Sequence, residues 1–438
     1  MDLFVINGGR TLSGETRISG SKNAALPVLF ATLLTKERCE ARNVPELRDV
    51  QSAYELLNYL GKNCFYGYGT FVSSENAPIK AEAPYDLVRK MRASVLAAGP
   101  LLARFGHARF SLPGGCTIGV RPIDIHLEGF RQFGAEISYN KGDVILSSKK
   151  LCPAEIKLRF PSVGATENLL MAAALIEGES VIENCAKEPE IEDLCAVLSK
   201  MGAEIGGAGT DCIKIRGKAE LKGFKHDIMP DRIETGTFML LCAAAGGRIT
   251  LTGADSKPLA ALIRAMRKAG VKITAGKNYI TVDSPVSRPK PVDITTKPHP
   301  GFPTDLQAPW MAFMAQCSGA CIINEKLFEN RFMHVPELAR MEADITVSGS
   351  KAIIRGVPGL MGAPVMASDL RAGAALVVAA AAARGTTVIR RIYHIDRGYE
   401  KLEMKLRDLG ADVRRRKDEA ELASAGEDGT FPEKEAKQ

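Results

Sequence analysis

The sequence predicts an α/β protein built from six pseudo-repeats of about 70 residues, and three observations support this fold class. A helix that ends at a turn residue and leads into a short strand recurs six times. An apolar helix rich in small residues precedes each of these turns. The chain has 438 residues, enough for two or three domains with large cores. The turn residues are Gly61, Gly134, Gly202, Gly270, Glu342 and Gly410, at intervals of 73, 68, 68, 72 and 68 residues.

In each repeat, the glycine after the helix predicts a left-handed cap, and the β-branched residues after it predict a strand. The fifth repeat has Glu342 in place of glycine, so its cap is expected to be built differently. The apolar helices have little polar surface and are expected to be buried between sheets. In chain order they occupy 21–34, 91–103, 162–175, 232–245, 304–316 and 368–383, followed by β-rich stretches such as 179–184, 247–253 and 385–392.

The composition excludes several classes of protein. Hydrophobic residues make up 45% and charged residues 25%, which argues against a disordered or fibrous chain. The net charge of +7 is too small and too dispersed to indicate nucleic-acid binding. The longest apolar run, residues 372–383, is shorter than the roughly 18 residues of a membrane span. Ten cysteines without a CxxC motif, and an N-terminus unlike a secretory signal, predict a cytoplasmic protein.

Motif searches narrow the chemistry further. The sequence contains no GxxxxGK[ST] and no GxGxxG that follows a strand, so a nucleoside triphosphate or dinucleotide cofactor is not expected. It contains no HExxH, and its six histidines are widely separated, which argues against a zinc site. We therefore expect no cofactor and no metal.

The openings of the six apolar helices are polar or charged, and the repeats divide into two groups of three near residues 229–231. Equivalent helix N-termini in a symmetric fold point in related directions, and helix N-termini attract anions. Two lobes would thus direct positive helix ends to one cleft. This arrangement favours a small, highly anionic substrate over a polymer.

A glycine-rich segment, residues 111–126, carries the first candidate for chemistry. Gly114, Gly115 and Gly119 predict a mobile loop, and Cys116 lies at its tip near Arg121. Most free cysteines are small buried hydrophobes. An exposed, electropositive setting instead favours a reactive thiol, and we prefer this interpretation for Cys116.

Two further candidates open helices. Lys22 at a helix N-terminus is unfavourable for the helix dipole unless an anion binds there, and the alternative is a solvated surface lysine. Thr304 and Asp305 are candidates for N-cap residues, with a catalytic base as the alternative of equal weight for Asp305.

Several arginines recur near repeat openings. Asp369 is expected to cap a helix from which Arg371 projects, Arg397 is expected to open the last helix, and Arg331 lies within the segment ENRFMHVPEL, residues 329–338. Each arginine alone is better explained as a solvated charge or an ion pair. Ion pairing alone does not explain why arginines recur at the openings of the repeats, so this recurrence indicates a shared function.

A series of ordered motifs extends along most of the chain. They are GSKNAALP (20–27), MRAS (91–94), LPGGCTIG (112–119), SVGAT (162–166), EPEI (188–191), IMPDRIETGTF (228–238), FPTDLQA (302–308), ENRFMHVPEL (329–338), ASDLRAG (367–373) and RIYHIDRGYE (391–400). With these motifs the chain resembles the UDP-N-acetylglucosamine 1-carboxyvinyltransferase family of enolpyruvyl transferases from Met1 to about Arg414. The resemblance implies two inside-out α/β barrel-like domains of three repeats each, 1–21 with 230–418, and 22–229. The polar, charged residues 419–438 are expected to form a flexible tail.

The resemblance also implies roles for individual residues. Those that bind phosphoenolpyruvate are Lys22, Asn23, Arg121 and Arg397. Those that bind the sugar nucleotide are Arg92, Arg121, Pro122, Ile123, Asp124, Ile125, Ser162, Val163, Gly164, Asp305 and Leu327. Those that close or support the site are Arg331, Asp369 and Arg371. Some relatives have Lys-Val where this chain has Phe160 and Pro161, which casts doubt on Phe160 as a nucleotide ligand.

The reaction implied by the resemblance transfers the enolpyruvyl group of phosphoenolpyruvate to the 3-hydroxyl of UDP-N-acetylglucosamine and releases phosphate, at the start of peptidoglycan synthesis. Cys116 is expected to donate a proton to C3, Asp305 to accept the hydroxyl proton, and Lys22 and Arg397 to assist as cations. A phosphonate epoxide such as fosfomycin is expected to alkylate Cys116. The two substrates are the expected partners, with no nucleic acid, membrane or obligate protein. The alternatives are an enolpyruvyl transferase acting on shikimate 3-phosphate and a non-catalytic sugar-nucleotide-binding protein.

Overall fold

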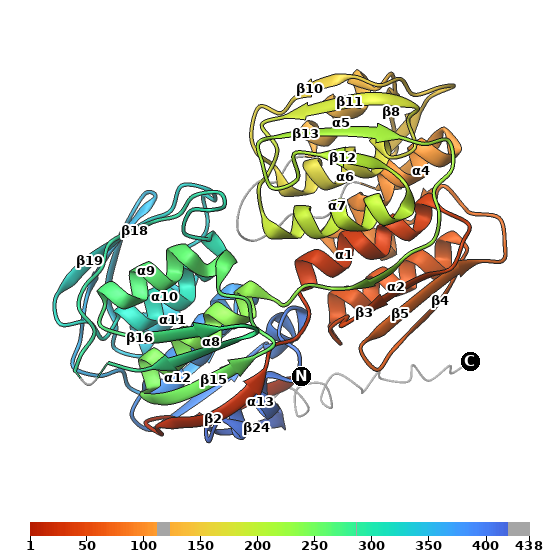
Figure 1. Cartoon of the computed structure of the whole chain (residues 1–438). Helices are drawn as coiled ribbons and strands as arrows, with labels where there is room; N and C mark the ends of the chain where they lie inside the picture. The colour runs from red at the N-terminus through yellow and green to blue at the C-terminus, as the bar shows by residue number, and fades with distance from the viewer. Residues whose placement is uncertain (112–122, 286, 419–438) are drawn as a thin grey trace, which may run out of the picture.

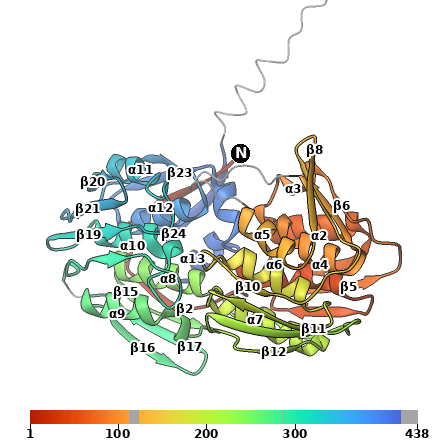
Figure 2. The ribbon, with the colours of Figure 1, turned by 90° about the horizontal axis from the view of Figure 1, so that it is seen from above.

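The computed structural model describes residues 1–111, 123–285 and 287–418. Figure 1 shows these residues as two lobes joined by two crossing segments. One hydrophobic core uses residues from 24 to 228, here called the continuous lobe. The other uses residues 4–18 together with residues from 233 to 413, here called the split lobe. The view from above shows the lobes side by side (Figure 2).

Across the described ranges, the strands form six four-stranded sheets that share one topology. In the third repeat, β10 (Glu155–Lys157) and β11 (Gly178–Glu183) are parallel. β13 (Cys212–Gly217) then pairs antiparallel with both β11 and β12 (Glu204–Gly206). The other five sheets have the same pattern of one parallel and two antiparallel pairs, although β14, β2 and β1 each join their sheets from a distant part of the chain. The predicted α/β fold of six pseudo-repeats is therefore confirmed.

The continuous lobe contains three sheets, in the orders β14-β3-β5-β4, β6-β7-β9-β8 and β10-β11-β13-β12. Its remaining strands are β3 (Cys39–Arg42), β4 (Lys62–Gly67), β5 (Thr70–Glu75), β6 (Glu82–Ala83), β7 (His107–Ser111), β8 (Glu136–Asn140), β9 (Asp143–Ser147) and β14 (Lys225–Asp227). Its helices are α1 (Lys22–Ala31), α2 (Arg48–Leu60), α3 (Tyr85–Val88), α4 (Ala98–Phe105), α5 (Asp124–Gln132), α6 (Val163–Ala173) and α7 (Pro189–Met201).

The split lobe contains the sheets β16-β17-β15-β2, β18-β19-β21-β20 and β22-β23-β1-β24. Its strands are β1 (Asp2–Asn7), β2 (Leu12–Arg17), β15 (Gly247–Thr252), β16 (Lys272–Gly276), β17 (Tyr279–Asp283), β18 (Ile294–Thr295), β19 (Ala320–Asn324), β20 (Asp344–Ser348), β21 (Lys351–Arg355), β22 (Pro364–Met366), β23 (Thr386–Arg390) and β24 (Asp412–Lys417). Its helices are α8 (Arg232–Ala245), α9 (Ala260–Lys268), α10 (Gln307–Met314), α11 (Val335–Arg340), α12 (Leu370–Ala382) and α13 (Leu402–Asp408).

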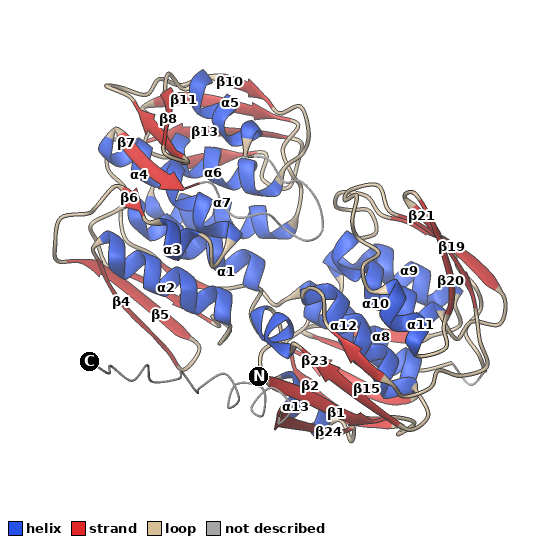
Figure 3. Cartoon of the chain, turned by 180° about the vertical axis from the view of Figure 1, so that it is seen from behind, coloured by secondary structure: helices blue, strands red, loops and turns tan. Residues whose placement is uncertain are grey.

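Each lobe has helices at its centre and sheets around them (Figure 3). In the split lobe, α8, α10 and α12 contact one another, and nearly every residue of each helix is buried. Alanine and glycine on these helices allow close approach, and an all-round apolar surface suits a helix surrounded by protein. The prediction that the small-residue helices are buried is confirmed.

Two short crossing segments join the lobes and lie against each other. Gly20 and Pro230 form an isolated antiparallel bridge. Beside it, the Ser21 N–H donates to Met229 O at 2.7 Å, and the Asp231 N–H donates to Ser19 O at 2.9 Å. Immediately after the crossing, α1 and α8 begin, one in each lobe. The N-termini of two central helices are thus fixed at the junction of the lobes.

The structure corrects two sequence predictions. The cap of the fifth repeat is not built differently, because Glu342 itself adopts the left-handed conformation with φ of 67°. Its N–H donates to Ala339 O, as the Gly202 N–H donates to Ser199 O in the third repeat. Arg397 does not open the last helix. It ends a 3₁₀ helix, Ile392–Arg397, and α13 begins five residues later at Leu402.

Candidate functional site

A cationic group lies where the two lobes meet. Lys22 is the first residue of α1, and Ser21 caps this helix by accepting a hydrogen bond from the Ala24 N–H at 3.3 Å. The Lys22 Nζ lies 3.3 Å from Asp49 Oδ2, and Arg397 Nε lies 2.8 Å from Asp49 Oδ1. Asp49, in the first turn of α2, therefore connects a lysine of the continuous lobe to an arginine of the split lobe.

Sequence reasoning missed Asp49. An acidic residue in the first turn of a helix is common because it suits the helix dipole, so nothing in the sequence distinguishes this carboxylate. In the structure it is 5% exposed and unites two predicted phosphoenolpyruvate ligands. Asn23 lies next to Lys22 on α1 and is partly exposed. The fourth predicted ligand of this group, Arg121, lies outside the described residues.

A second ionic group surrounds Asp305. Arg331 donates from Nη2 to Asp305 Oδ1 at 2.5 Å, and Arg371 donates from Nη2 to Oδ2 at 3.0 Å. Burial opposes ionisation of this carboxyl, but the charges of Arg371 and Arg331 outweigh it and hold the pKa of Asp305 well below its ordinary value. Asp305 is therefore an ionised carboxylate with a fixed orientation.

Arg371 is itself held in place. Its Nη1 donates to the Tyr399 hydroxyl at 3.3 Å, and this hydroxyl lies 2.8 Å from Thr237 Oγ1 on α8. Asp369 caps α12 by accepting from the Arg371 and Ala372 N–H groups at 2.9 and 3.1 Å. The predicted capping function of Asp369 is confirmed, and the cap fixes the backbone from which Arg371 projects.

Thr304 and Asp305 are not N-cap residues, which corrects one of the two interpretations considered for them. Pro303 occupies the position before the 3₁₀ helix Thr304–Leu306, and no side chain caps that helix. Thr304 Oγ1 donates instead to Glu325 Oε2 at 2.9 Å. Leu327 lies near the same carboxylate, and its N–H donates to Glu325 Oε1 at 2.9 Å.

The start of α6 forms a third part of the site. Ser162 caps this helix by accepting from the Ala165 N–H at 3.3 Å, followed by Val163 and Gly164. A side chain at position 164 would contact the His126 ring on α5, at 3.4 Å for a Cβ. His126 is buried, and burial together with the nearby charge of Arg92 lowers its pKa to about 4. Predicted nucleotide ligands from three segments thus lie around one neutral imidazole.

Arg159 was also missed by sequence reasoning. It forms ion pairs with Asp124 at the start of α5 and with Glu128 one turn later, the latter at 2.7 Å. Ile123 and Ile125 flank Asp124, so the ion pair connects this segment to the residues before α6. Phe160 is 45% exposed. Cys116, Arg121 and Pro122 lie outside the described residues, as does the tail 419–438.

A buried ion pair joins the lobes beside the site. Arg232, the first residue of α8, donates from Nε and Nη2 to Glu190 of α7 at 2.9 and 3.2 Å. Both side chains are buried. Burial next to Glu190 and Glu188 raises the pKa of Glu167 well above its ordinary value. The Arg232 guanidinium therefore lies at an interface that contains the carboxyl groups of Glu190 and Glu188, with that of Glu167 next to them.

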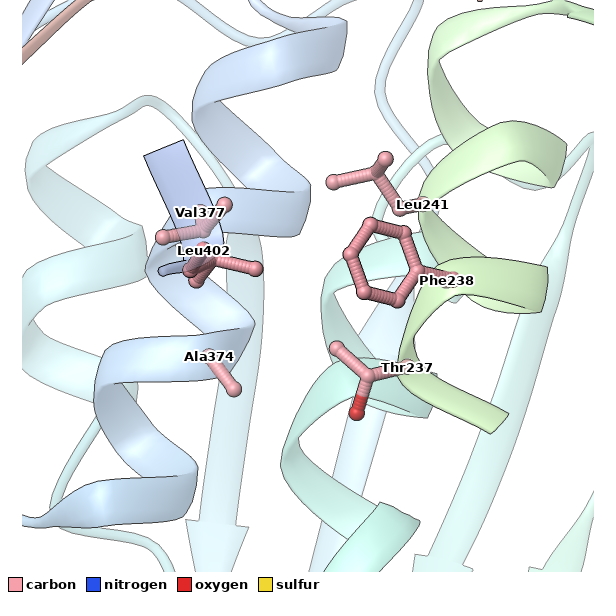
Figure 4. A pocket seen from close by; sticks show the side chains of 6 residues that line it. All are labelled: Thr237, Phe238, Leu241, Ala374, Val377 and Leu402. Carbon is pink, nitrogen blue, oxygen red and sulfur yellow. The ribbon is translucent and has the colours of Figure 1, made fainter. Parts of the chain in front are cut away.

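Two hollows among the described residues contain no predicted site residue: one of about 210 Å³ beside α9, lined in part by Arg264 and Phe302, and one inside the core of the split lobe. Figure 4 shows a gap between α8 and α12 whose lining is mainly apolar and which has no room for a water molecule. None of its six lining residues is a predicted site residue. Within the described ranges, no group of three His, Cys, Asp or Glu side chains could hold a metal ion, and no helix is long and apolar enough to cross a membrane.

Comparisons with known proteins agree on one family. The model of the EPSP synthase (3-phosphoshikimate 1-carboxyvinyltransferase) family matches residues 6–406. UDP-N-acetylglucosamine 1-carboxyvinyltransferase from Magnetococcus marinus is 53% identical over 95% of this chain and 99% of the relative. The protein of the same name from Elusimicrobium minutum is 51% identical over 94% of this chain and 98% of the relative.

Solved structures share the fold. The enolpyruvyl transferase NikO from Streptomyces tendae is similar with a TM-score of 0.85 and 27% identity, covering 94% of this chain and 98% of that one. An EPSP synthase from Acinetobacter baumannii is similar with a TM-score of 0.75 and 16% identity, covering 95% of this chain and all of that one. The second likeness concerns the fold alone.

Proposed function

The chain belongs to the family of UDP-N-acetylglucosamine 1-carboxyvinyltransferases, and from this membership we propose how its residues carry out the reaction. It is an enzyme that transfers the enolpyruvyl group of phosphoenolpyruvate to UDP-N-acetylglucosamine and releases phosphate, the first step of peptidoglycan synthesis. The observation that best supports the residue assignment is the meeting of Lys22 and Arg397 at Asp49, across the two lobes.

Lys22 and Arg397 hold the phosphate and carboxylate of phosphoenolpyruvate, together with Asn23 and Arg121. The substrate has about three negative charges, and clustered cations stabilise both its binding and the departure of phosphate. Because Lys22 and Arg397 belong to different lobes, binding of the anion draws the lobes together. Asp49 holds the two cations in place and must share them with the substrate.

Asp305 accepts the proton of the sugar hydroxyl. Arg331 and Arg371 keep the carboxylate ionised, and each oxygen retains a second lone pair for the hydroxyl. A carboxylate with a low pKa is a weak base, so it accepts the proton only as the hydroxyl oxygen bonds to C2 and becomes more acidic. Cys116 delivers the other proton to C3. Phosphate then leaves C2 of the tetrahedral intermediate while C3 returns a proton to the Cys116 thiolate, which restores the carbon–carbon double bond of the enolpyruvyl group.

The sugar nucleotide binds along the start of α6 and the residues around α5. The Ser162 N–H already donates to Phe160 O at 2.7 Å, so the N–H groups of Val163 and Gly164 and the positive helix end are the groups that suit an anionic diphosphate. Arg92, the segment from Arg121 to Ile125, and Leu327 complete this site. Gly164 leaves room beside His126, so the backbone can approach the ligand closely.

The same chain supplies the residues of both substrate sites, so the proposal requires no obligate protein partner, nucleic acid or membrane. The cytoplasm is the proposed location, because the scattered cysteines suit a reducing compartment. Release of inorganic phosphate from phosphoenolpyruvate tests the function, with UDP-N-acetylglucosamine and shikimate 3-phosphate offered in turn. Release with the sugar nucleotide alone supports it. Release only with shikimate 3-phosphate, or with neither acceptor, refutes it.

A further inference from the structure

Glu325 is a buried carboxylate directly after β19, only 2% exposed. Its Oε1 accepts hydrogen bonds from the Thr296 hydroxyl at 2.8 Å, the Leu327 N–H at 2.9 Å and the Phe328 N–H at 3.3 Å. Its Oε2 accepts from the Thr304 hydroxyl at 2.9 Å. Four donors on one carboxylate compensate for the loss of water around a buried charge.

The partners of Glu325 lead to the site along two routes. Thr304 directly precedes Asp305, so the bond to Oε2 fixes the backbone that carries the proposed base. On the other side, the N–H bonds to Oε1 fix the loop that carries Leu327. That loop continues to Arg331, whose guanidinium packs 5.5 Å from the centre of the Phe328 ring and binds Asp305.

A carboxylate is well suited to this position because all four neighbours donate. Glutamine would keep one acceptor oxygen for the loop, but its NH₂ group would face the Thr304 hydroxyl, which would have to turn and accept. Alanine would leave two N–H groups and two hydroxyls without their partner. The four donors around this position therefore favour glutamate over glutamine or alanine.

We propose that Glu325 is a positioning residue for the transfer reaction. It acts through Thr304 and Leu327 and aligns the base with the bound sugar. This inference rests on the proposed function. Lys22 and Arg397 lie on elements that Glu325 does not contact in any hydrogen bond described above, so its effect should be confined to the sugar side of the reaction.

Steady-state kinetics of three variants test the proposal. In Glu325→Ala, kcat is expected to fall about 100-fold, because small displacements of reacting groups have effects of this size. The KM for UDP-N-acetylglucosamine is expected to rise, while the KM for phosphoenolpyruvate stays within about twofold. Thr304→Val, which removes a single hydrogen bond, is expected to lower kcat about tenfold. The kcat of Glu325→Gln is expected to lie between those of the wild type and the alanine variant.

Asp344→Asn is the matched control, because it removes a negative charge from an exposed position of β20 outside the site, and its kinetics should stay within about twofold of the wild type. Wild-type kinetic constants in Glu325→Ala would overturn the proposal, as would an equal rise in both KM values. If the alanine variant does not fold, unchanged kcat in both Thr304→Val and Glu325→Gln would overturn it. A wild-type enzyme that releases no phosphate with UDP-N-acetylglucosamine would instead refute the proposed function, on which this inference depends.

Discussion

Two guanidinium groups on one carboxylate determine the protonation of Asp305. Their charges hold its pKa well below the ordinary value despite burial. A base of this kind stays ionised throughout the neutral range, so the acid limb of the rate profile should lie at low pH. The two arginines make Asp305 a weaker base, but they keep its carboxylate ionised and fixed in orientation.

Arg371→Gln tests this balance. Loss of the largest favourable charge should raise the pKa of Asp305, because burial then acts against fewer cations. The acid limb of kcat/KM should move to higher pH, so activity below pH 6 should fall more than activity at pH 8. A pH profile of kcat/KM measures the shift, with Arg340→Gln on the exposed face of α11 as the control. If the acid limb of kcat/KM stays at the same pH, a group other than Asp305 determines it.

Asp305 is the proposed base of the reaction, and the proton donor predicted from the sequence is the thiol of Cys116. Replacement of Cys116 by Asp keeps a proton donor but lowers its ordinary pKa from about 8.5 to about 3.9. Activity should then survive mainly at lower pH, and alkylation by a phosphonate epoxide should be abolished. Rate measurements across pH and the mass of the treated protein check both expectations. The same pH profile in both proteins would show that this thiol is not the limiting acid.

Residues of the site differ in how far the sequence could predict them. Lys22, Asp305 and Arg397 stand in motifs, so the resemblance assigned them roles. Asp49 and Glu325 stand in ordinary helical and strand-end contexts. Their functions arise from partners that are distant along the chain, and no local pattern records such partners.

At the scale of elements, the sequence predicted the helix, turn and strand of every repeat because glycine and β-branched residues mark them. It did not predict that three of the helical openings considered are 3₁₀ turns, at Arg92–Ala97, Thr304–Leu306 and Ile392–Arg397. Tight turns of this length have weak propensities, and packing decides them. For this reason the sequence wrongly predicted that the last helix begins at Arg397.

The left-handed turn of the fifth repeat offers a prediction about stability. Glu342 has φ of 67°, a conformation that glycine adopts at no steric cost. Glu342→Gly should therefore stabilise the split lobe by up to about 1 kcal/mol, and the melting temperature should rise by a few degrees.

The matched change in the other lobe is Gly202→Ala. Gly202 has φ of 116°, and an added Cβ would meet no atom within 4 Å. Any loss of stability there comes from the backbone alone, and about 1 kcal/mol is expected. Thermal unfolding of the two variants measures both effects. A loss of stability in Glu342→Gly would mean that the glutamate side chain contributes more than its backbone strain costs.

At the scale of the molecule, the lobes are joined by ionic contacts as well as by the crossing segments. The Arg232–Glu190 pair is buried on both sides, unlike the partly exposed Arg397–Asp49 pair. A buried arginine that loses its partner is strongly destabilising, by roughly 3–5 kcal/mol. The pair therefore couples the stability of one lobe to that of the other.

Glu190→Gln should uncouple the lobes. Urea unfolding is expected to shift to lower concentrations and to separate into two transitions, because Arg232 remains buried without a counter-charge. Arg232→Met in the same background removes the uncompensated charge and should restore part of the loss. A single transition at the wild-type midpoint in Glu190→Gln would show that the pair does not couple the lobes.

The pairing of β1 has a consequence for how the chain is made. This strand lies between β23 and β24, and β2 pairs with β15, so both strands bind partners that are synthesised much later. The continuous lobe has all its strands by Asp227 and can fold while synthesis proceeds. Until translation reaches Lys417, β1 cannot complete its pairing with β24. The order of translation thus makes the insertion of β1 between β23 and β24 a late step in the folding of the split lobe.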